Sequence, residues 1–288
     1  MKLLIISGRS GSGKSTALNM LEDHGYYCID NLPASLLPAL AQRVSAQSGE
    51  FPVAVSIDAR NIPSDLQQVP AIIKQLREMS LHTEIIFLDA SSPTLIKRFS
   101  ESRRKHPLTT EKIGLRQAIN METSLLEQIA LLANLSIDTS YMSLHQLREM
   151  IKTRVVERED SGLALMFESF GYKHGVPIDA DVVFDVRCLP NPYWVEELRP
   201  LTGLDGKVQQ WLGEQEIVES MYQDLCQYLL KWLPKFEENN RSYMTVAIGC
   251  TGGQHRSVYL SERLRKNFSN KIKNVQVMHR ELLRRELL

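Results

Sequence analysis

The pattern of apolar and polar positions predicts an α/β domain in the first half of the chain. Short apolar runs alternate there with longer stretches of helical periodicity. Continuous apolar runs between turn residues are typical of strands in a sheet covered on both faces. Such alternation predicts a parallel sheet with right-handed helical crossovers. The expected strands are KLLIIS (2–7), YYCID (26–30), VAVSID (53–58), EIIFLD (84–89) and LSIDTS (135–140).

The intervening segments carry recognisable helix ends. A serine followed three residues later by glutamine fits the capping box, and serine before proline fits an N-cap and a first helical residue. Gly25 suits the end of the first helix. Helix starts are therefore expected at Ser64 (with Gln67), Ser92 (before Pro93) and Ser143 (with Gln146).

A second α/β set follows a charged, less patterned stretch, RVVEREDSG, at 154–162. We place a boundary there and expect domains at 1–153 and 154–288. A helical pattern spans 208–233. Strands are expected at LALMFESF (163–170), ADVVFDV (180–186), YMTVAIG (243–249) and KNVQVMH (273–279).

Composition is that of an ordinary globular protein, with 43% hydrophobic and 24% charged residues among 288. A formal net charge of zero argues against bulk attraction to nucleic acid or anionic membrane but permits a local basic patch. No run has the length of a membrane span or of a signal-peptide core. The separated cysteines form no CxxC pair, so we expect free thiols and a cytoplasmic protein: Cys28, Cys188, Cys226 and Cys250.

The most specific motif is GRSGSGKS at 8–15, which fits the phosphate loop G-x-x-x-x-G-K-[ST]. A strand before it and a helix after it disfavour a merely glycine-rich turn. The glycines let backbone N–H groups approach phosphate oxygens, Lys14 supplies charge to the β and γ phosphates, and Ser15 holds Mg²⁺. The expected nucleotide site is Gly8, Arg9, Ser10, Gly11, Ser12, Gly13, Lys14 and Ser15.

An acidic residue at the end of a neighbouring strand should help to position the metal. Asp58 and Asp89 both fit, and each has a helix cap or turn residue as its alternative role. Asp30 also ends a strand and could face a substrate or the metal. No N-K-x-D signature of guanine selectivity is present, so ATP and GTP both remain open.

A basic segment precedes HPL and has two interpretations. In small-molecule phosphotransferases, arginines in such a lid clamp the transferred phosphate. A solvated basic helix end is the alternative. The residues are Arg98, Arg103, Arg104 and Lys105.

The stretch CTGGQHRS at 250–257 has the C-x₅-R spacing of cysteine phosphatases. Its glycines permit a nest of N–H groups, and Arg256 can add a bidentate contact to phosphate. Turnover also needs a general acid, and the sequence contains no identifiable acid loop. Anion binding without turnover is therefore favoured over a phosphatase, and Cys250 as a buried residue at a strand end is the structural alternative.

Several motifs together resemble the RapZ family, also called the YvcJ or YhbJ family. They run in the same order from Lys2 to about His279: GRSGSGKS, CIDNLP, SIDARN, FESFGYKHG, FDVRCLPNP, TGLDG and AIGCTGGQHRSVY. The resemblance implies an N-terminal domain like P-loop kinases that hydrolyses ATP or GTP. It further implies that the second nucleotide-binding segment consists of Asp58, Ala59, Arg60 and Asn61.

For the C-terminal domain, the resemblance implies binding of a small regulatory RNA, its presentation to an endoribonuclease, and sensing of glucosamine-6-phosphate. A homo-oligomer is expected. The chain departs from the sugar-sensing members at Tyr193, where they have histidine, and in its mixed tail HRELLRRELL. The loop expected to hold the phosphate of the amino sugar consists of Cys250, Thr251, Gly252, Gly253, His255, Arg256 and Ser257.

The C-terminal part is also rich in basic residues. Arg263 to Arg285 contains eight lysines or arginines against one glutamate, which suits a phosphate backbone. A solvated surface is the alternative. A small-molecule kinase is the competing function, but it leaves the second domain unexplained. The expected RNA contacts are Lys273, Arg280, Arg284 and Arg285.

Overall fold

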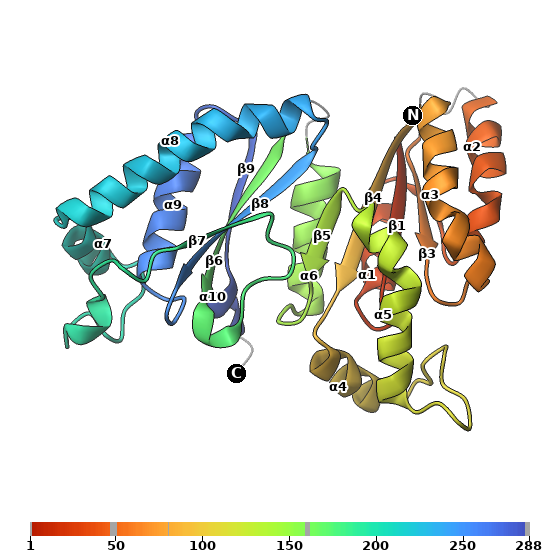
Figure 1. Ribbon diagram of the computed structural model, residues 1–288, viewed down its shortest axis with the longest axis horizontal. Coiled ribbons are helices and arrows are strands. Elements are labelled where there is room, and N and C mark those ends of the chain that lie inside the picture. Colours follow the sequence, from red (N-terminus) through yellow and green to blue (C-terminus); the bar gives the residue numbers. More distant parts are fainter. Residues whose placement is uncertain (1, 47–50, 80, 159–161, 286–288) are drawn as a thin grey trace. The chain divides into compact units, whose positions relative to one another are not determined.

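The computed structural model describes residues 2–46, 51–79, 81–158 and 162–285. The chain divides into two compact units, Met1–Glu157 and Arg158–Leu288. Each is built around its own parallel sheet, as Figure 1 shows. Among the described residues, no helix is long and apolar enough to cross a membrane. The expected α/β fold class is therefore confirmed for both halves of the chain.

The first unit has a five-stranded sheet in the order β2-β3-β1-β4-β5, with every strand pair parallel. All five predicted runs form strands. Every residue of β3 is buried, whereas β2 is a short edge strand that begins with exposed Tyr27. The strands are β1 (Lys2–Gly8), β2 (Tyr27–Ile29), β3 (Val53–Ile57), β4 (His82–Asp89) and β5 (Leu135–Asp138).

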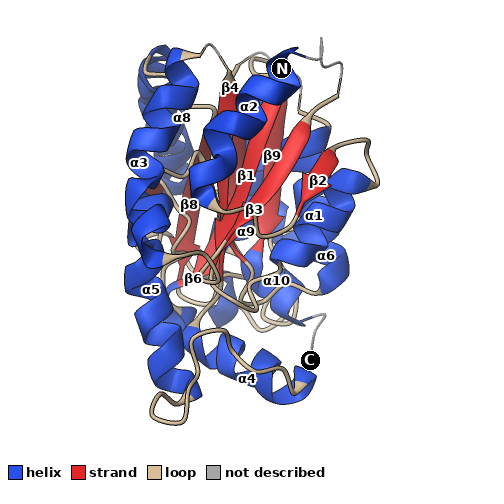
Figure 2. Cartoon of the chain, turned by 90° about the vertical axis from the view of Figure 1, so that its right-hand side faces the viewer, coloured by secondary structure: helices blue, strands red, loops and turns tan. Residues whose placement is uncertain are grey.

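Helices cover both faces of this sheet. Figure 2 shows α2, α3 and α5 on one side and α1 and α6 on the other. The side chains of α2, α3 and α5 meet those of β1, β3 and β4 in one apolar cluster that includes Ile5, Val55 and Ile85. The helices are α1 (Lys14–Glu22), α2 (Leu37–Ala46), α3 (Pro63–Glu78), α4 (Ser92–Ser102), α5 (Leu115–Leu131) and α6 (Leu144–Ile151).

The predicted helix starts had different outcomes. Ser143 and Gln146 form the full capping box of α6, as expected. The N-cap of α4 is Ser91 rather than Ser92, which becomes the first helical residue. The prediction at Ser64 is wrong, because α3 begins one residue earlier at Pro63, whose fixed φ suits a first turn without a side-chain cap. Gly25 adopts positive φ three residues after α1 ends.

The second unit has a four-stranded parallel sheet in the order β7-β8-β6-β9. The helical pattern over 208–233 belongs to two helices, α7 and α8, because the chain breaks at Glu214 and Gln215. Side chains of α7, α8 and α9 pack against the sheet in one apolar core. The elements are β6 (Ala164–Gly171), β7 (Val182–Asp185), β8 (Tyr243–Cys250), β9 (Asn274–His279), α7 (Gly206–Gly213), α8 (Glu216–Glu238), α9 (Arg256–Phe268) and α10 (Arg280–Arg285).

Parallel pairing decides where functional loops gather. The carboxyl ends of parallel strands share one edge of a sheet, where α/β proteins bind their ligands. In the first unit this edge carries the loops after β1, β3 and β4, and in the second it carries those after β6, β7 and β8. The phosphate loop, the segment from Asp58 to Asn61 and the loop that begins at Cys250 therefore lie at such edges.

Candidate nucleotide site and anion loop

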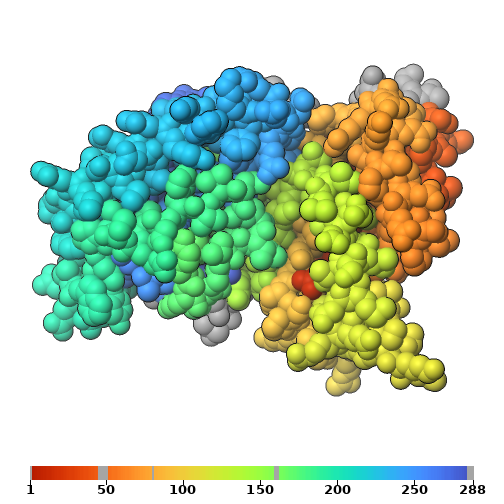
Figure 3. Space-filling view, in the orientation of Figure 1, coloured from red at the N-terminus to blue at the C-terminus, as the bar shows by residue number. Residues whose placement is uncertain are grey.

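The phosphate loop connects β1 to α1 at the carboxyl edge of the first sheet. Gly8, Gly11 and Gly13 all have positive φ. A Cβ on Gly8 would lie 1.9 Å from the carbonyl oxygen of Leu88 in β4, so only glycine permits this approach of the two strands. The loop reaches the surface, where Figure 3 shows a small red patch from the N-terminal segment between yellow atoms.

The start of α1 is open to an anion. Gly13 occupies the N-cap position in the left-handed region, and no side chain among the described residues caps the helix. Uncapped N–H groups and the helix dipole favour negative charge at this end. Ser15, in the first turn, has an exposed side chain. The loop therefore presents both backbone donors and a hydroxyl to a phosphate group.

Lys14 lies beneath the loop. Its Nζ donates to the carbonyl oxygens of Gly8 and Arg9 at 2.9 and 3.2 Å, and it lies 3.7 Å from Oδ2 of Asp58. Burial lowers the pKa of Lys14, while the charge of Asp58 opposes that change. Burial would raise the pKa of Asp58, but hydrogen bonds from Arg60 and the charge of Lys14 leave it below its ordinary value. An ion pair therefore lies directly at the phosphate loop.

The structure separates the two acidic candidates for the metal. Asp58 is adjacent to Lys14, whereas the Oδ1 of Asp89 accepts from Nε of Arg9 at 2.7 Å and from its neighbour's amide. Arg9 also donates to the carbonyl oxygen of Ala90. Asp89 thus anchors the side chain of Arg9, and Asp58 is the acidic candidate that lies next to Lys14.

The segment from Asp58 to Asn61 joins the ends of β2 and β3. Nη2 of Arg60 donates to Asp58 at 2.8 Å and to Asp30 at 3.1 Å. Asn61 accepts from the amide of Ala34 at 2.8 Å and donates to Asn31 at 3.1 Å. Ala59 is buried. Arg60 and Asp30 remain partly exposed beside the phosphate loop, so this pair can reach a ligand.

A buried contact between a glutamate and a histidine supports the loop from behind, and sequence reasoning missed it. Glu122 of α5 accepts from the amide and the hydroxyl of Ser10 at 2.9 and 2.8 Å. Nε2 of His106 lies 3.0 Å from the same carboxylate, and neither of these two side chains is exposed. The available signal was a glutamate within the apolar stripe of α5, between Ile119 and Leu126.

Arg98 belongs to the same support rather than to a solvent-exposed lid. It donates to the carbonyl oxygen of Gly11 and to Oγ1 of Thr139, each at 3.0 Å. Thr139 in turn donates to the carbonyl oxygen of Ser12 at 2.9 Å. The other basic residues of this segment, Arg103 to Lys105, are exposed beyond the end of α4.

In the second unit, Cys250 ends β8 and begins the predicted anion loop. Its Sγ accepts from the amide of Gly253 at 3.2 Å and lies 3.1 Å from Oγ of Ser257. Burial would raise the pKa of this thiol, but the hydrogen bonds of Ser257 and the charge of Arg256 leave it below its ordinary value. The surroundings of Cys250 therefore favour a thiolate.

Arg256 is buried and holds the loop to the segment after β7. Its Nη1 donates to the carbonyl oxygens of Arg187 and Leu189, each at 2.9 Å, and Nη2 donates to Oγ1 of Thr251 at 3.2 Å. Gly252 is partly exposed, whereas His255 and Ser257 are buried. The loop is thus a fixed, positively charged turn at the end of β8.

The residues predicted to contact RNA differ in their exposure to solvent. Lys273 is exposed just before β9. Arg280 is only 8% exposed and donates to the carbonyl oxygens of Gly175 and His174 at 3.1 and 3.3 Å. The side chains of Arg284 and Arg285 lie outside the described residues. Arg280 therefore secures the loop after β6 and is too buried to be the exposed contact that the sequence predicted.

Known proteins resemble this chain along its length. A protein of Pseudomonas fluorescens strain SBW25 is 56% identical over 284 residues, which is 98% of this chain and 100% of that protein. A protein of Pseudomonas aeruginosa strain PAO1 is 57% identical, covering 98% and 99%. Both are called nucleotide-binding proteins. An unliganded sugar kinase from Janibacter aligns with a TM-score of 0.36 and 17% identity over 53% of this chain and 93% of its own, too distant to bear on function.

Two family models match consecutive parts of the chain. The model of the RapZ-like N-terminal domain matches residues 1–159, and that of the RapZ C-terminal domain matches residues 163–283. The order and extent of these matches agree with the two units of the structure. The chain therefore belongs to the RapZ family.

Proposed function

We propose that the first unit binds ATP or GTP with Mg²⁺ and hydrolyses it. The observation that carries this proposal is Lys14, buried under the glycine loop and 3.7 Å from Asp58. The relatives named nucleotide-binding proteins support the same ligand class. Backbone amides and Lys14 contact the phosphates of the bound nucleotide. In the absence of nucleotide, Asp58 balances the charge of Lys14.

Ser15 and Asp58 would hold the metal. When bound with the nucleotide, Mg²⁺ neutralises charge on the β and γ oxygens. Arg60 hydrogen-bonds Asp58 and directs its carboxylate. Glu122, Arg98 and Thr139 fix the loop backbone, so the amides stay oriented before the ligand binds.

Equilibrium binding of labelled ATP and GTP tests this function. Lys14→Ala should abolish tight binding because it removes the positive charge of the loop, and the ammonium contacts polar atoms rather than an apolar core. Lys74→Ala, an exposed lysine on α3, is the charge-matched control and should bind as the wild type does. Unchanged affinity in Lys14→Ala would remove the nucleotide assignment.

For the second unit, we propose that it binds small regulatory RNA and a phosphorylated amino sugar. The anion loop at Cys250 and Arg256 supports the phosphate site, and exposed Lys273 supports contact with RNA. On this proposal the protein is a cytoplasmic homo-oligomer that presents RNA to an endoribonuclease in response to the sugar. Membership of the RapZ family supports this role.

RNA binding measured with and without glucosamine-6-phosphate tests the adaptor role. Sugar phosphate in the anion loop should lower RNA affinity, because the loop leads directly into α9 and the basic residues beyond it. Arg256→Ala should abolish the effect of the sugar. An absence of salt-dependent RNA binding would refute the adaptor role.

A small-molecule kinase is the second candidate function. The exposed pair of Asp30 and Arg60 beside Asp58 favours it, because a carboxylate can accept a hydroxyl proton while an arginine holds an anionic acceptor. Transfer of the γ-phosphate from labelled ATP to metabolite pools, lost in Asp30→Asn, would establish the kinase. Hydrolysis without any labelled acceptor would exclude it.

A further inference from the structure

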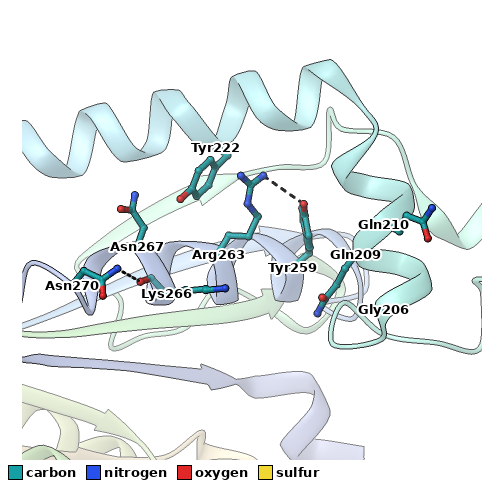
Figure 4. Close-up of a pocket in the computed structure, with 9 residues that line it drawn as sticks. All are labelled: Gly206, Gln209, Gln210, Tyr222, Tyr259, Arg263, Lys266, Asn267 and Asn270. Atoms are coloured by element: carbon teal, nitrogen blue, oxygen red, sulfur yellow. Dashed lines mark hydrogen bonds between the residues drawn. The ribbon is translucent and has the colours of Figure 1, made fainter.

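The second unit contains an open groove of about 640 Å³ between α7, α8 and α9. Its volume lies in the range of roughly 300–1,000 Å³ that is typical of sites for small organic groups. Figure 4 shows side chains from all three helices turned toward the same space. The groove is thus a built feature of the packed helices.

Apart from Gly206, the side chains that line the groove are polar or aromatic. Carboxamides lie at both ends, Gln209 and Gln210 on α7, and Asn267 and Asn270 on α9 or just beyond it. No carboxylate and no aliphatic side chain belongs to the lining. Such a surface disfavours a lipid or an apolar peptide. It presents carboxamide groups, and the amide nitrogens of Gln209, Gln210 and Asn267 also donate to atoms of the protein.

Arg263 forms the middle of the groove. Its guanidinium lies 3.8 Å from the ring centre of Tyr222, and Nη1 is held by Glu219 at 2.7 Å and lies 3.5 Å from the hydroxyl of Tyr259. Figure 4 shows it between the two tyrosines. These contacts fix a flat cation and two aromatic rings in place, which lowers the entropy cost of binding.

The second cation is Lys266, one turn further along α9 and exposed. Glu219 offsets the charge of Arg263, so Lys266 supplies the net positive charge of the lining, which favours an anionic ligand. Amide groups pair with the edges of nucleobases, and tyrosine and arginine stack on their faces. A ligand that is both anionic and planar, with polar edges, meets every part of this lining.

We propose that this groove binds a nucleotide of single-stranded RNA. Its position supports RNA as the source, because α9 leads from the groove to the exposed basic residues Lys271 and Lys273. A single RNA strand that contacts those lysines places its next nucleotide at the end of α9. The inference rests on the proposed RNA binding and adds to it a site that discriminates single strands from duplex.

The test uses the full-length protein and fluorescence anisotropy with a short single-stranded oligouridylate and an RNA duplex of equal length. The groove variant Lys266→Ala with Asn270→Ala removes exposed side chains only. It should weaken binding of the single strand roughly tenfold, equivalent to about 1.4 kcal/mol, and duplex binding much less. Lys231→Ala with Gln227→Ala on α8 removes the same groups outside the groove and should change neither.

Photocrosslinking identifies the position of the base. An oligonucleotide that carries 4-thiouridine should crosslink to Tyr222 or Tyr259 in the wild type. If the groove variant and the control variant bind the single strand equally well and no such crosslinks form, the groove is not an RNA site. RNA binding elsewhere on the protein would remain possible. If the wild-type protein binds no RNA, both the RNA-binding role of the second unit and the RNA site in the groove are refuted. Efficient crosslinking of 4-thiouridine monophosphate but not of the oligonucleotide would assign the groove to free nucleotide and overturn the RNA source.

Discussion

At the residue scale, the phosphate loop depends on side chains that cannot touch phosphate. Glu122 satisfies both donors of Ser10 and also His106, in a fully buried position. A buried carboxylate is retained at such cost only when its hydrogen bonds are complete. The amides of Ser10 and Ser12 both donate within the protein, to Glu122 and to the carbonyl oxygen of Arg9, so phosphate would have to be bound by other amides of the loop.

Glu122→Ala should lower the free energy of unfolding by about 3 kcal/mol, because it leaves Ser10 and His106 without their acceptor. Nucleotide affinity should fall as the loop loses its fixed shape. Urea denaturation and nucleotide binding measure the two effects. Glu127→Ala, exposed on the same helix, is the control. Equal stability of the two variants would contradict a supporting role for Glu122.

The lowered pKa of the Cys250 thiol leads to a prediction about its ionisation. Because its thiol pKa is lowered in the folded protein, a titration of absorbance at 240 nm should show ionisation below the ordinary thiol pKa. Subtraction of Cys250→Ser isolates this thiol. The stabilisation it contributes is present above the unfolded pKa and is lost as pH falls through the folded pKa. A midpoint at or above the ordinary value would contradict a thiolate-favouring loop.

Arg256 and Cys250 should differ in their effect on anion binding. Arg256→Ala removes a charged donor, whereas Cys250→Ser removes only a sulfur, so the first should weaken glucosamine-6-phosphate far more than the second. Isothermal titration measures both affinities. Steady release of phosphate from an aryl phosphate, lost in Cys250→Ser, would instead show that the loop is catalytic.

At the scale of elements, close approach of β1 to β4 sets the position of the phosphate loop. Gly8 pairs with Leu88 in the parallel register, and its Cα faces a carbonyl of β4 with no space for a side chain. Gly25 also has positive φ, but nothing lies within 4 Å of its Cβ position. Substitutions at the two glycines therefore distinguish the cost of a steric clash, at Gly8, from the cost of backbone strain alone, at Gly25.

Gly25→Ala should cost about 1 kcal/mol, because only the left-handed conformation opposes it. Gly8→Ala should cost at least about 3 kcal/mol, since a backbone carbonyl cannot move aside without shifting β4. Denaturant unfolding of both variants gives the comparison. Similar losses would indicate that β1 and β4 adjust to the added methyl group.

At the scale of the whole molecule, two parallel sheets each present their loops at a carboxyl edge. The first edge carries a phosphate loop before a helix, and the second carries the anion loop before α9. In each unit, a glycine-containing loop thus leads from the end of a strand into the N-terminus of a helix, where amides favour an anion. The proposed nucleotide and sugar-phosphate sites are therefore chemically similar and structurally separate.

RNA binding should depend on salt, because each neutralised phosphate of a single strand contributes roughly 0.7 to the negative slope of log affinity against log salt. Lys273→Ala should flatten this slope, whereas Arg280→Ala should mainly reduce stability because that side chain is buried. Anisotropy titrations at several salt concentrations measure the slope. By reciprocity, RNA must lower sugar-phosphate affinity by the factor by which the sugar lowers RNA affinity.

The sequence by itself determined what depends on neighbouring residues. Strands followed from apolar runs, the capping box from Ser143 and Gln146, and the phosphate loop from one contiguous octapeptide. These features are local because a strand period, a cap and a glycine turn involve only a few successive residues. Family membership also followed from contiguous motifs.

Only the tertiary structure decided which distant groups meet. It placed Asp58 rather than Asp89 beside Lys14, joined Glu122 to Ser10 across 112 positions of sequence, and buried Arg280. The groove likewise draws on three helices whose polar faces look like ordinary solvated surface in the sequence. Pairing of charges and the shape of cavities arise from packing between elements, and no short segment of sequence contains that information.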